Sequence, residues 1–374
     1  MRCVVLGGTG CVGQAILAIL SERALCSYGD VSVLGSESSK GRKISFGAQS
    51  CVVRSAETYP FHQDDVVFSA VSAEVARRYI PKALKAGARV IDKSSAYRKE
   101  VPLVVPEVNG HLLSAKTALV ASPNCVAIPL SLVLNPLHKM WGVKRLVVST
   151  YQAVSGAGYK GVEALEKEAL EKECLSQKRI PFSIKNQGVC ENSNALRAED
   201  HSVMHGGAGY TGYQAENANK HETSDNKSGD KSVFGAPIAL NVIPQIGPLD
   251  EAGISDEESK IIFEVQKILD CTIPIHVTAV RVPVFVGHGM SVVVDFEKGV
   301  DLQKVGCLLK EAPGIVCDDA FVTPCESAGK DDVFVGRVRA MDQNTLSFWC
   351  VSDNVRKGAA LNAVQIAEKW GALK

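Results

Sequence analysis

A glycine-rich loop directly after an N-terminal strand is the feature that most restricts how this chain can fold. Residues Arg2–Leu6 read as a short strand, and the following GGTGCVG contains the pattern GxGxxG from Gly8 to Gly13. Apolar residues then recur at helical spacing from Val12 to Leu20. This order lets backbone N–H groups approach a pyrophosphate at the helix N-terminus, although a tight turn without a ligand remains the alternative. We expect cofactor contacts at Gly8, Thr9, Gly10, Cys11 and Val12.

Strand-like and helix-like segments alternate after this loop. The sequence predicts strands at 31–34, 65–70 and 89–92, and a helix at 73–86. Such alternation indicates βαβ units and therefore a parallel sheet. We expect a Rossmann-type α/β dinucleotide-binding domain over residues 1–125.

The rest of the chain predicts an α+β catalytic domain over residues 126–351. Its first helix begins close to Cys125, because Pro129 is tolerated only in a first helical turn. A last helix follows Asp353 or Asn354, either of which could cap it. The predicted strands are 144–150, 236–244, 278–286 and 346–351, and the predicted helices are 160–174, 257–269 and 358–370.

Composition excludes several classes of protein. Lys plus Arg and Asp plus Glu both number 41 in 374 residues, so bulk attraction to nucleic acid or to anionic membranes is not expected. No apolar run approaches the roughly 18 residues of a membrane span, and the N-terminus does not read as a signal peptide. The 12 cysteines show no paired spacing, which favours reduced thiols and a cytoplasmic protein.

Residues 192–232 differ from the rest in composition. They are rich in Asn, Ser, Gly, Asp and Lys, which predicts a long polar surface excursion. His201, His205 and His221 lie in it, but no Cys or acidic residue stands at ligand spacing, so we expect a solvated loop and no metal.

The segment after the second strand bears on the choice of cofactor. Glu37 lies where an acid could bind the ribose 2′-hydroxyl of NAD, but two residues separate it from the expected strand end. The hydroxyls and cations of residues 36–43 suit a 2′-phosphate instead. We therefore expect NADP, with NAD possible, bound through Ser36, Ser38 and Ser39.

Cys125 at a helix start suggests a reactive thiol, because the helix dipole stabilises a thiolate. Further along, His288 could be the base that takes the thiol proton, and Arg281 could bind a carboxylate. We place both on one strand that breaks at Gly287. Each of these three residues could instead have a purely structural role.

Residues 149–160 contain a run of small residues. Ser155 and Gly156 begin a loop that would let backbone approach a ligand, and Gln152 could orient a substrate carbonyl. A polar side chain at a strand end is the alternative for Gln152.

Together these stretches resemble the aspartate-β-semialdehyde dehydrogenase family over nearly the whole chain. Many ordered matches are more specific than any single motif. The matching stretches, besides the glycine loop, are SSAYR (94–98), VPEVN (105–109), PNC (123–125), TYQAVSGAG (150–158), NVIPQI (241–246), EESK (257–260), VRVP with GH, and DNVRKGAALNAVQIAE (353–368).

The resemblance implies roles for the candidate residues. Cys125 would be the nucleophile and His288 the acid–base, with Gln152 and Asn124 positioning the reacting group.

The remaining roles concern substrate and cofactor. Arg281 would bind the α-carboxylate and Glu257 the α-ammonium, while Arg98 and Lys260 bind phosphate. Asn354 would contact the nicotinamide side, so that residues 352–374 return to the first domain.

The implied reaction is the reversible NADPH-dependent reduction of L-4-aspartyl phosphate to L-aspartate 4-semialdehyde, through a Cys125 thioester, by a homodimer. It would serve biosynthesis of lysine and diaminopimelate, threonine and methionine. One rival is N-acetyl-glutamyl-phosphate reductase, whose substrate has no free ammonium and leaves Glu257 without a purpose. A non-catalytic nucleotide-binding redox sensor is the rival from another class.

Three positions depart from the family pattern. Lys93 stands where many relatives have Asn, Gly289 where Ser is usual, and Ser38 where Arg is frequent in NADP-using relatives. We expect neither Lys93 nor Gly289 to touch the chemistry directly.

Overall fold

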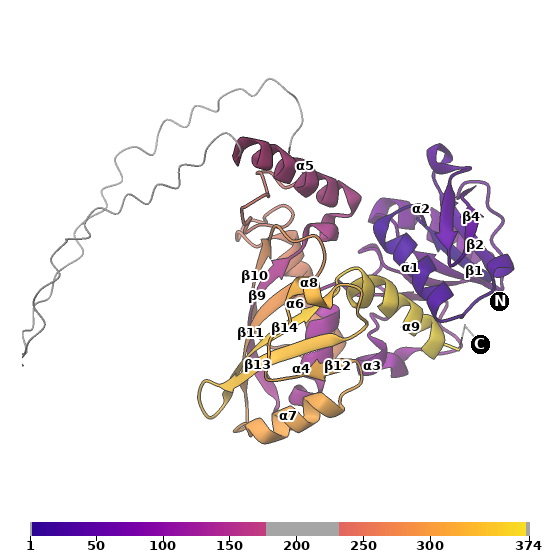
Figure 1. Cartoon of the computed structure of the whole chain (residues 1–374). Helices are drawn as coiled ribbons and strands as arrows, with labels where there is room; N and C mark the ends of the chain where they lie inside the picture. Colours follow the sequence, from indigo (N-terminus) through magenta and orange to yellow (C-terminus); the bar gives the residue numbers. More distant parts are fainter. Residues whose placement is uncertain (1, 177–231, 372–374) are drawn as a thin grey trace, which may run out of the picture. The chain divides into compact units, whose positions relative to one another are not determined.

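The computed structural model describes residues 2–176 and 232–371, and its core is two six-stranded sheets (Figure 1). The first has the order β5-β2-β1-β6-β7-β8 and the second β10-β9-β11-β14-β13-β12. The expected class, a parallel Rossmann-type sheet followed by an α+β part, is confirmed. The domain limits at residues 125 and 352 stay a prediction.

Every strand pair of the first sheet is parallel, as the alternation of segments predicted. Its strands are β1 (Arg2–Leu6), β2 (Val31–Gly35), β5 (Arg54–Ser55), β6 (Asp65–Ser69), β7 (Arg89–Asp92) and β8 (Leu119–Ala121). After β1 the chain crosses to β2 on one side and later to β6 on the other. The strand order thus reverses between β1 and β6, which is where ligands bind in open α/β sheets.

Both faces of the first sheet are buried. Cys3 and Val5 of β1 pack with α1 (Cys11–Glu22) and α9 (Leu361–Lys369), while Val4 and Leu6 face α2 (Ala73–Lys85). Successive strand residues point to opposite faces, so an apolar strand of this kind needs helices on both sides.

The second sheet is mixed, and helices cover one face. The helices are α4 (Ala127–Trp141), α6 (Asp256–Leu269) and α7 (Leu302–Glu311), which share an apolar core with the sheet. Its strands are β9 (Val143–Gln152), β10 (Ile275–Arg281), β11 (His288–Phe296), β12 (Ile315–Cys317), β13 (Val333–Ala340) and β14 (Thr345–Ser352). On the other face Val147 and Tyr151 remain 37% and 38% exposed, so that face is less covered in the single chain.

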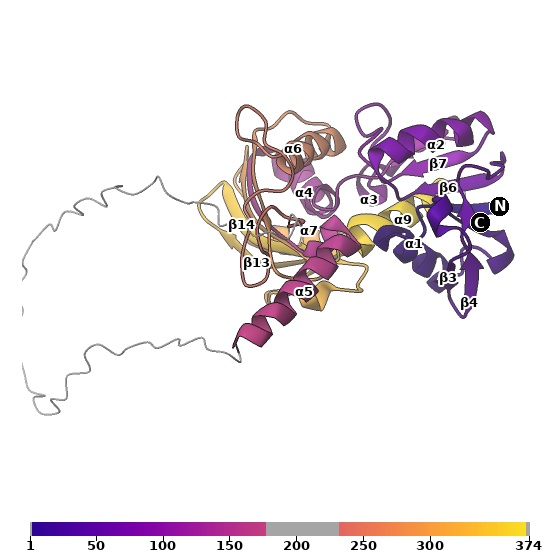
Figure 2. The ribbon, with the colours of Figure 1, turned by 90° about the horizontal axis from the view of Figure 1, so that it is seen from above.

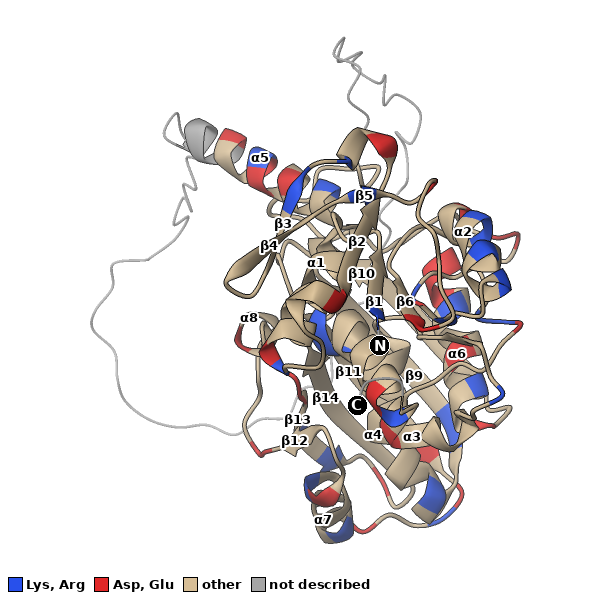
Figure 3. Cartoon of the chain, turned by 90° about the vertical axis from the view of Figure 1, so that its right-hand side faces the viewer, with Lys and Arg blue, Asp and Glu red and all other residues tan. Residues whose placement is uncertain are grey.

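Further helices and a hairpin lie outside the two sheets and the helices described so far. They are the hairpin β3 (Lys43–Phe46) and β4 (Gln49–Val52), the short helices α3 (Pro106–Asn109) and α8 (Pro324–Ser327), and α5 (Tyr159–Ser176). Charged residues of both signs lie on α5 and α7 (Figure 3), in keeping with the balanced composition. No helix among residues 2–176 and 232–371 is both long and apolar enough for a membrane crossing. Most of the polar segment 192–232, with its three histidines, lies outside the described residues.

One predicted strand was wrong, and another was right only in its first part. Residues 236–244 form no strand, because Leu240 takes a positive φ of 59° and the Asn241 amide bonds locally, donating to Pro237 O at 2.9 Å. Only Ile243 bridges to Arg281. The segment 278–286 is strand only as far as Arg281, where β10 ends before Pro283.

The helical tail begins earlier than predicted. Residues Arg356–Ala360 form a π-helical turn that continues into α9, and the Asp353 carboxylate caps it by accepting from the N–H groups of Val355 and Arg356 at 2.7 and 2.8 Å. Asp353, not Asn354, is therefore the cap. The α9 helix lies against α1 (Figure 2), as expected for a tail that returns to the first sheet.

Candidate active site

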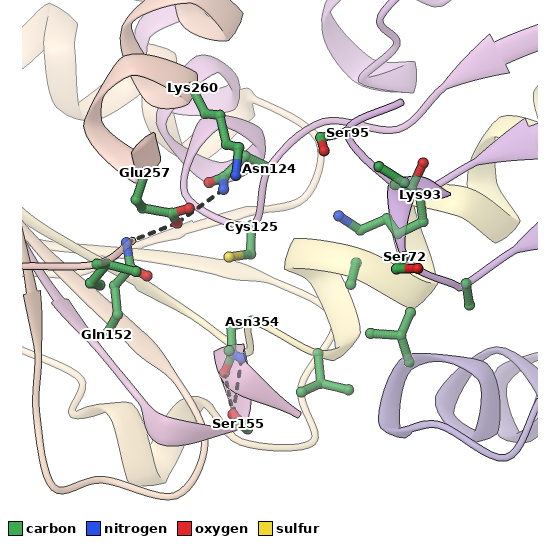
Figure 4. Close-up of a pocket in the computed structure, with 18 of the residues that line it drawn as sticks. Ser72, Lys93, Ser95, Asn124, Cys125, Gln152, Ser155, Glu257, Lys260 and Asn354 are labelled. Carbon is green, nitrogen blue, oxygen red and sulfur yellow. Dashed lines mark hydrogen bonds between the residues drawn. The ribbon is translucent and has the colours of Figure 1, made fainter. Parts of the chain in front are cut away.

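A cavity of about 480 Å³ gathers most of the predicted site residues (Figure 4). We call it the Cys125 cavity. It contains a thiol, a carboxylate, two guanidinium groups and two ammonium groups. Its lining includes the predicted residues Val12, Arg98, Asn124, Cys125, Gln152, Ser155, Gly156, Glu257, Lys260, Arg281 and Asn354.

The end of β9 organises one wall. In the strand register Gln152 is paired with Arg281 of β10 on one side and with His288 of β11 on the other. Arg281 and His288 therefore lie on two strands that flank β9, and the expectation of one interrupted strand was wrong. Gly287, with φ of 97°, lies at the end of the loop that joins the two strands.

Cys125 lies between β8 and α4, just before the first helical residue, Ala127. The helix start is where the sequence placed it, but the thiol is not acidic. Burial, followed by the Glu257 carboxylate, raises the pKa of Cys125 to about 11, against the opposing effect of Lys93, Arg281 and Arg98. In the chain by itself desolvation therefore outweighs the helix dipole, and the sulfur is protonated at neutral pH.

His288 is fully buried behind the wall and is not among the lining residues. Its Nδ1 accepts a hydrogen bond from the N–H of Ala153 at 3.0 Å. Burial, followed by the Arg281 guanidinium, lowers the pKa of His288 to about 3, so the ring is neutral. Since Nδ1 is an acceptor, the single proton sits on Nε2, which has no partner among the described atoms and faces Gly156. This tautomer can donate from Nε2 but cannot accept a thiol proton there.

Two amides hold the Glu257 carboxylate. Asn124 Nδ2 donates to its Oε1 at 3.0 Å, and Gln152 Nε2 donates to the same oxygen at 3.3 Å. Arg281, 5% exposed, donates from Nη1 to Ala153 O at 2.7 Å, while its Nε has no partner among the described atoms. Burial lowers the pKa of Arg281, because its guanidinium has lost hydration. An anion in the cavity would compensate for that loss.

Glu264 is a site residue that the sequence reasoning missed. Its buried carboxylate accepts from Arg98 Nη1 at 2.7 Å and from the backbone N–H of Asn124 at 2.6 Å. It thereby ties a predicted phosphate ligand to the residue before Cys125. Glu257, Lys260 and Glu264 follow at helical i, i+3, i+7 spacing, a pattern visible in the sequence that could have identified it.

A second cavity, of about 560 Å³, follows the glycine loop and is lined by Gly7, Thr9, Gly10, Ser36 and others. We call it the glycine groove. It shares Ala70, Val71 and Ser72 with the Cys125 cavity, so the two are continuous past the end of β6.

The glycine loop closes too tightly for side chains. A Cβ on Gly13 would lie 2.2 Å from Gly7 O, and one on Gly7 would lie 2.5 Å from Ala70 O. The compact backbone leaves its N–H groups accessible at the start of α1, where an anionic pyrophosphate fits.

Some predicted cofactor residues do not line either cavity: Gly8, Cys11, Ser38 and Ser39. Gly8 instead lies against Val33, with which a Cβ would clash at 2.4 Å. The hydroxyls of Ser38 and Ser39 lie 2.8 and 3.2 Å from that of Ser36, so the three form one cluster at the groove.

The tail enters the site through Asn354. Its Oδ1 accepts from the Gly287 N–H at 2.8 Å, and its Nδ2 donates to Ser155 Oγ at 3.0 Å. A Cβ on Gly358 would lie 3.1 Å from Cys125 Cβ, so this part of the tail packs directly on the nucleophile candidate.

Comparison with known proteins agrees with this arrangement. The family models described as semialdehyde dehydrogenase, NAD binding domain, and semialdehyde dehydrogenase, dimerisation domain, match residues 2–116 and 134–357. The aspartate-semialdehyde dehydrogenase of Rickettsia bellii is 36% identical over 98% of this chain and 96% of its own. The chain belongs to the aspartate-semialdehyde dehydrogenase family.

Other members of the family are similarly close. The Bacillus subtilis enzyme of that name is 34% identical over 98% of this chain and 96% of its own. The crystal structure of aspartate semialdehyde dehydrogenase II from Vibrio cholerae is 31% identical, with a TM-score of 0.79 over 98% of this chain and 97% of that one. This chain is thus an oxidoreductase of the aspartate pathway with a nicotinamide dinucleotide cofactor.

Two of the three departures from the family pattern, Gly289 and Lys93, have different outcomes. Gly289 stays clear of the cavity, and a Cβ there would lie 2.4 Å from the Trp349 ring, so a serine has no room. Lys93 does line the Cys125 cavity. The expectation that it takes no direct part in the chemistry stays a prediction. Among the residues that the structure describes, no group of three His, Cys, Asp or Glu side chains could hold a metal ion.

Proposed function

We propose that this chain catalyses the reversible reduction of L-4-aspartyl phosphate to L-aspartate 4-semialdehyde and phosphate, with NADPH, through a thioester on Cys125. The observation that carries the proposal is the convergence of Cys125, Glu257 and Arg281 on one cavity beside the glycine groove. A thiol, an acid and a guanidinium match the acyl carbon, ammonium and carboxylate of this substrate.

Binding places the acyl phosphate against the sulfur. Arg281 binds the α-carboxylate through the edge that carries its unpartnered Nε, and Glu257 accepts the α-ammonium. Arg98 and Lys260 face the phosphate, each already paired with an acid, Glu264 and Asp256. Those acids orient the cations before substrate arrives.

The Cys125 thiol loses its proton to water in the cavity, the sulfur attacks the acyl carbon, a C–S bond forms, and the C–O bond to phosphate breaks. A nicotinamide cofactor held at the glycine groove would supply the hydride for reduction of the thioester. The Nε2–H of His288 stabilises the oxyanion of the hemithioacetal, in agreement with the tautomer that Ala153 selects. The C–S bond then breaks to release the aldehyde and restore the thiolate, which regains a proton.

NADP is proposed as the cofactor because three hydroxyls gather at the end of β2. Ser36, Ser38 and Ser39 can all donate to a 2′-phosphate. Glu37, by contrast, is 62% exposed and paired with Lys40.

The assembly and the pathway products are part of the same proposal. We propose a homodimer with a binding domain of residues 1–125 and 352–374 and a second domain of residues 126–351. The dimerisation-domain match and the exposed face of β9 support the homodimer. The semialdehyde would feed lysine and diaminopimelate, threonine and methionine.

The test is NADPH oxidation with L-4-aspartyl phosphate, repeated with NADH and with N-acetyl-glutamyl phosphate. We expect turnover with the first substrate, a preference for NADPH, and none with the acetylated compound, which offers no ammonium to Glu257. Cys125→Ala should bind NADPH normally yet show no turnover. Turnover by that variant, or faster reduction of the acetylated substrate, would overturn the proposal.

A further inference from the structure

Lys93 is an unassigned cation in the Cys125 cavity. It follows β7 directly, is partly buried, and donates from Nζ to Pro123 O at 2.6 Å. In Figure 4 the Lys93 side chain extends into the cavity from the wall opposite Glu257, and its amino group points toward Cys125. The ammonium is therefore fixed to the carbonyl two residues before the thiol.

A closed set of hydrogen bonds holds this position. Arg98 Nη2 donates to Lys93 O at 2.9 Å, and Arg98 Nη1 donates to Glu264. Glu264 accepts from the Asn124 N–H, and Lys93 Nζ donates to Pro123 O, which closes the set. The Lys93 backbone and head group are thus both tied to the segment that carries the sulfur.

The thiol needs a cation that the other groups do not supply in full. Its pKa is raised by burial and Glu257, and the neutral His288 ring carries its proton on the nitrogen nearest the cavity. Arg98 is paired with the Glu264 carboxylate, whereas Arg281 and Lys93 each donate to a backbone carbonyl and keep their full charge. The charged and titratable groups that act on Lys93 are Arg98, Cys125, Glu264 and Glu257.

We propose that Lys93 is a positioning residue whose ammonium pairs with the ionised sulfur of Cys125 and stabilises the thiolate. The proton that the sulfur loses passes to water in the open cavity. The use of this thiolate in turnover rests on the proposed function, but its stabilisation does not.

The pairing has a defined pH dependence. Burial, followed by Arg98, lowers the pKa of Lys93 to about 8. The side chain is charged below that pH and neutral above it. The thiol form of Cys125 predominates at pH 7, but the ammonium increases the small thiolate fraction there, and this effect is lost as the pH rises through 8.

The experiment is alkylation of the ligand-free full chain with iodoacetamide, following the Cys125 peptide by mass spectrometry across pH. In this step sulfur displaces iodide, so the rate reports the thiolate. Lys93→Met should react about tenfold more slowly than wild type at pH 7, which is one pKa unit for the thiol. The ratio of the wild-type rate to the Lys93→Met rate should approach one above pH 9. Lys93→Arg should react at the wild-type rate at neutral pH.

Lys267→Met is the matched control. Lys267 also binds backbone carbonyls, those of Arg98 and Val101 at 2.7 and 2.9 Å, but it does not line the cavity. Its loss should leave the Cys125 profile unchanged. Two results would overturn the inference, provided that both variants unfold thermally like wild type. One is a ratio of wild-type to Lys93→Met alkylation rates that does not change with pH. The other is an equal alkylation rate of Lys93→Met and Lys267→Met at pH 7.

Because alkylation needs no substrate, it separates the two proposals. Failure of wild type to reduce aspartyl phosphate would count against the function alone. An unaltered Lys93→Met profile in an active enzyme would count against the inference alone.

Discussion

The glycine groove and the Cys125 cavity share Ala70–Ser72, yet they are built in different ways. The groove depends on backbone that closes within a few residues, from Gly7 to Gly13. The cavity depends on side chains from distant segments, such as Arg98 and Glu264, which lie 166 residues apart. The groove should therefore be sensitive to added atoms, and the cavity to lost charges.

The largest effect is expected from adding one methyl group to the groove. In Gly13→Ala the new Cβ would meet Gly7 O, so the loop must open, and we expect NADPH to bind about 100-fold more weakly. Gly29→Ala is the control, because nothing lies within 4 Å of its Cβ. Fluorescence titration measures both, and equal affinities would show that the groove tolerates side chains.

A smaller effect on ligand binding is expected from removing one charge of the cavity. Glu264→Gln keeps the shape but leaves Arg98 without its anion, so the free energy of unfolding should fall by about 3 kcal/mol. In the reverse direction KM for phosphate should rise about tenfold, while NADPH affinity stays constant. A parallel loss of NADPH affinity would show that the two regions are not separable.

The smallest effect is expected at the mouth of the groove. Ser36→Ala removes one hydroxyl of a cluster, worth about 1 kcal/mol, so NADPH should bind about fivefold more weakly and NADH unchanged. Equally weaker binding of NADPH and NADH would show that Ser36 does not contact the 2′-phosphate.

The same contrast explains what the sequence could predict. The groove is local, so the strand at Arg2–Leu6, its glycine loop and the following helix were all found from spacing alone. The thiol at the start of α4 was found from Pro129 and the motif around Cys125. In these cases the residues that act together are neighbours in the chain.

What the sequence could not predict depends on long-range packing. The placement of Arg281 and His288 on either side of Gln152 follows from strand order, which no local pattern encodes. Burial reversed the expected acidity of Cys125, and the contact of Lys93 with the segment before the thiol appears only in the folded chain.

Because Gly358 packs against Cys125, the exposure of this thiol depends on how much of the chain the ribosome has made. The sulfur is added early on the ribosome, but the turn Arg356–Ala360 that packs over it is made more than two hundred residues later. Until then the thiol lacks one of its neighbours and meets more water. The nascent polypeptide should therefore expose this cysteine to oxidants, and completion of the turn should shield it.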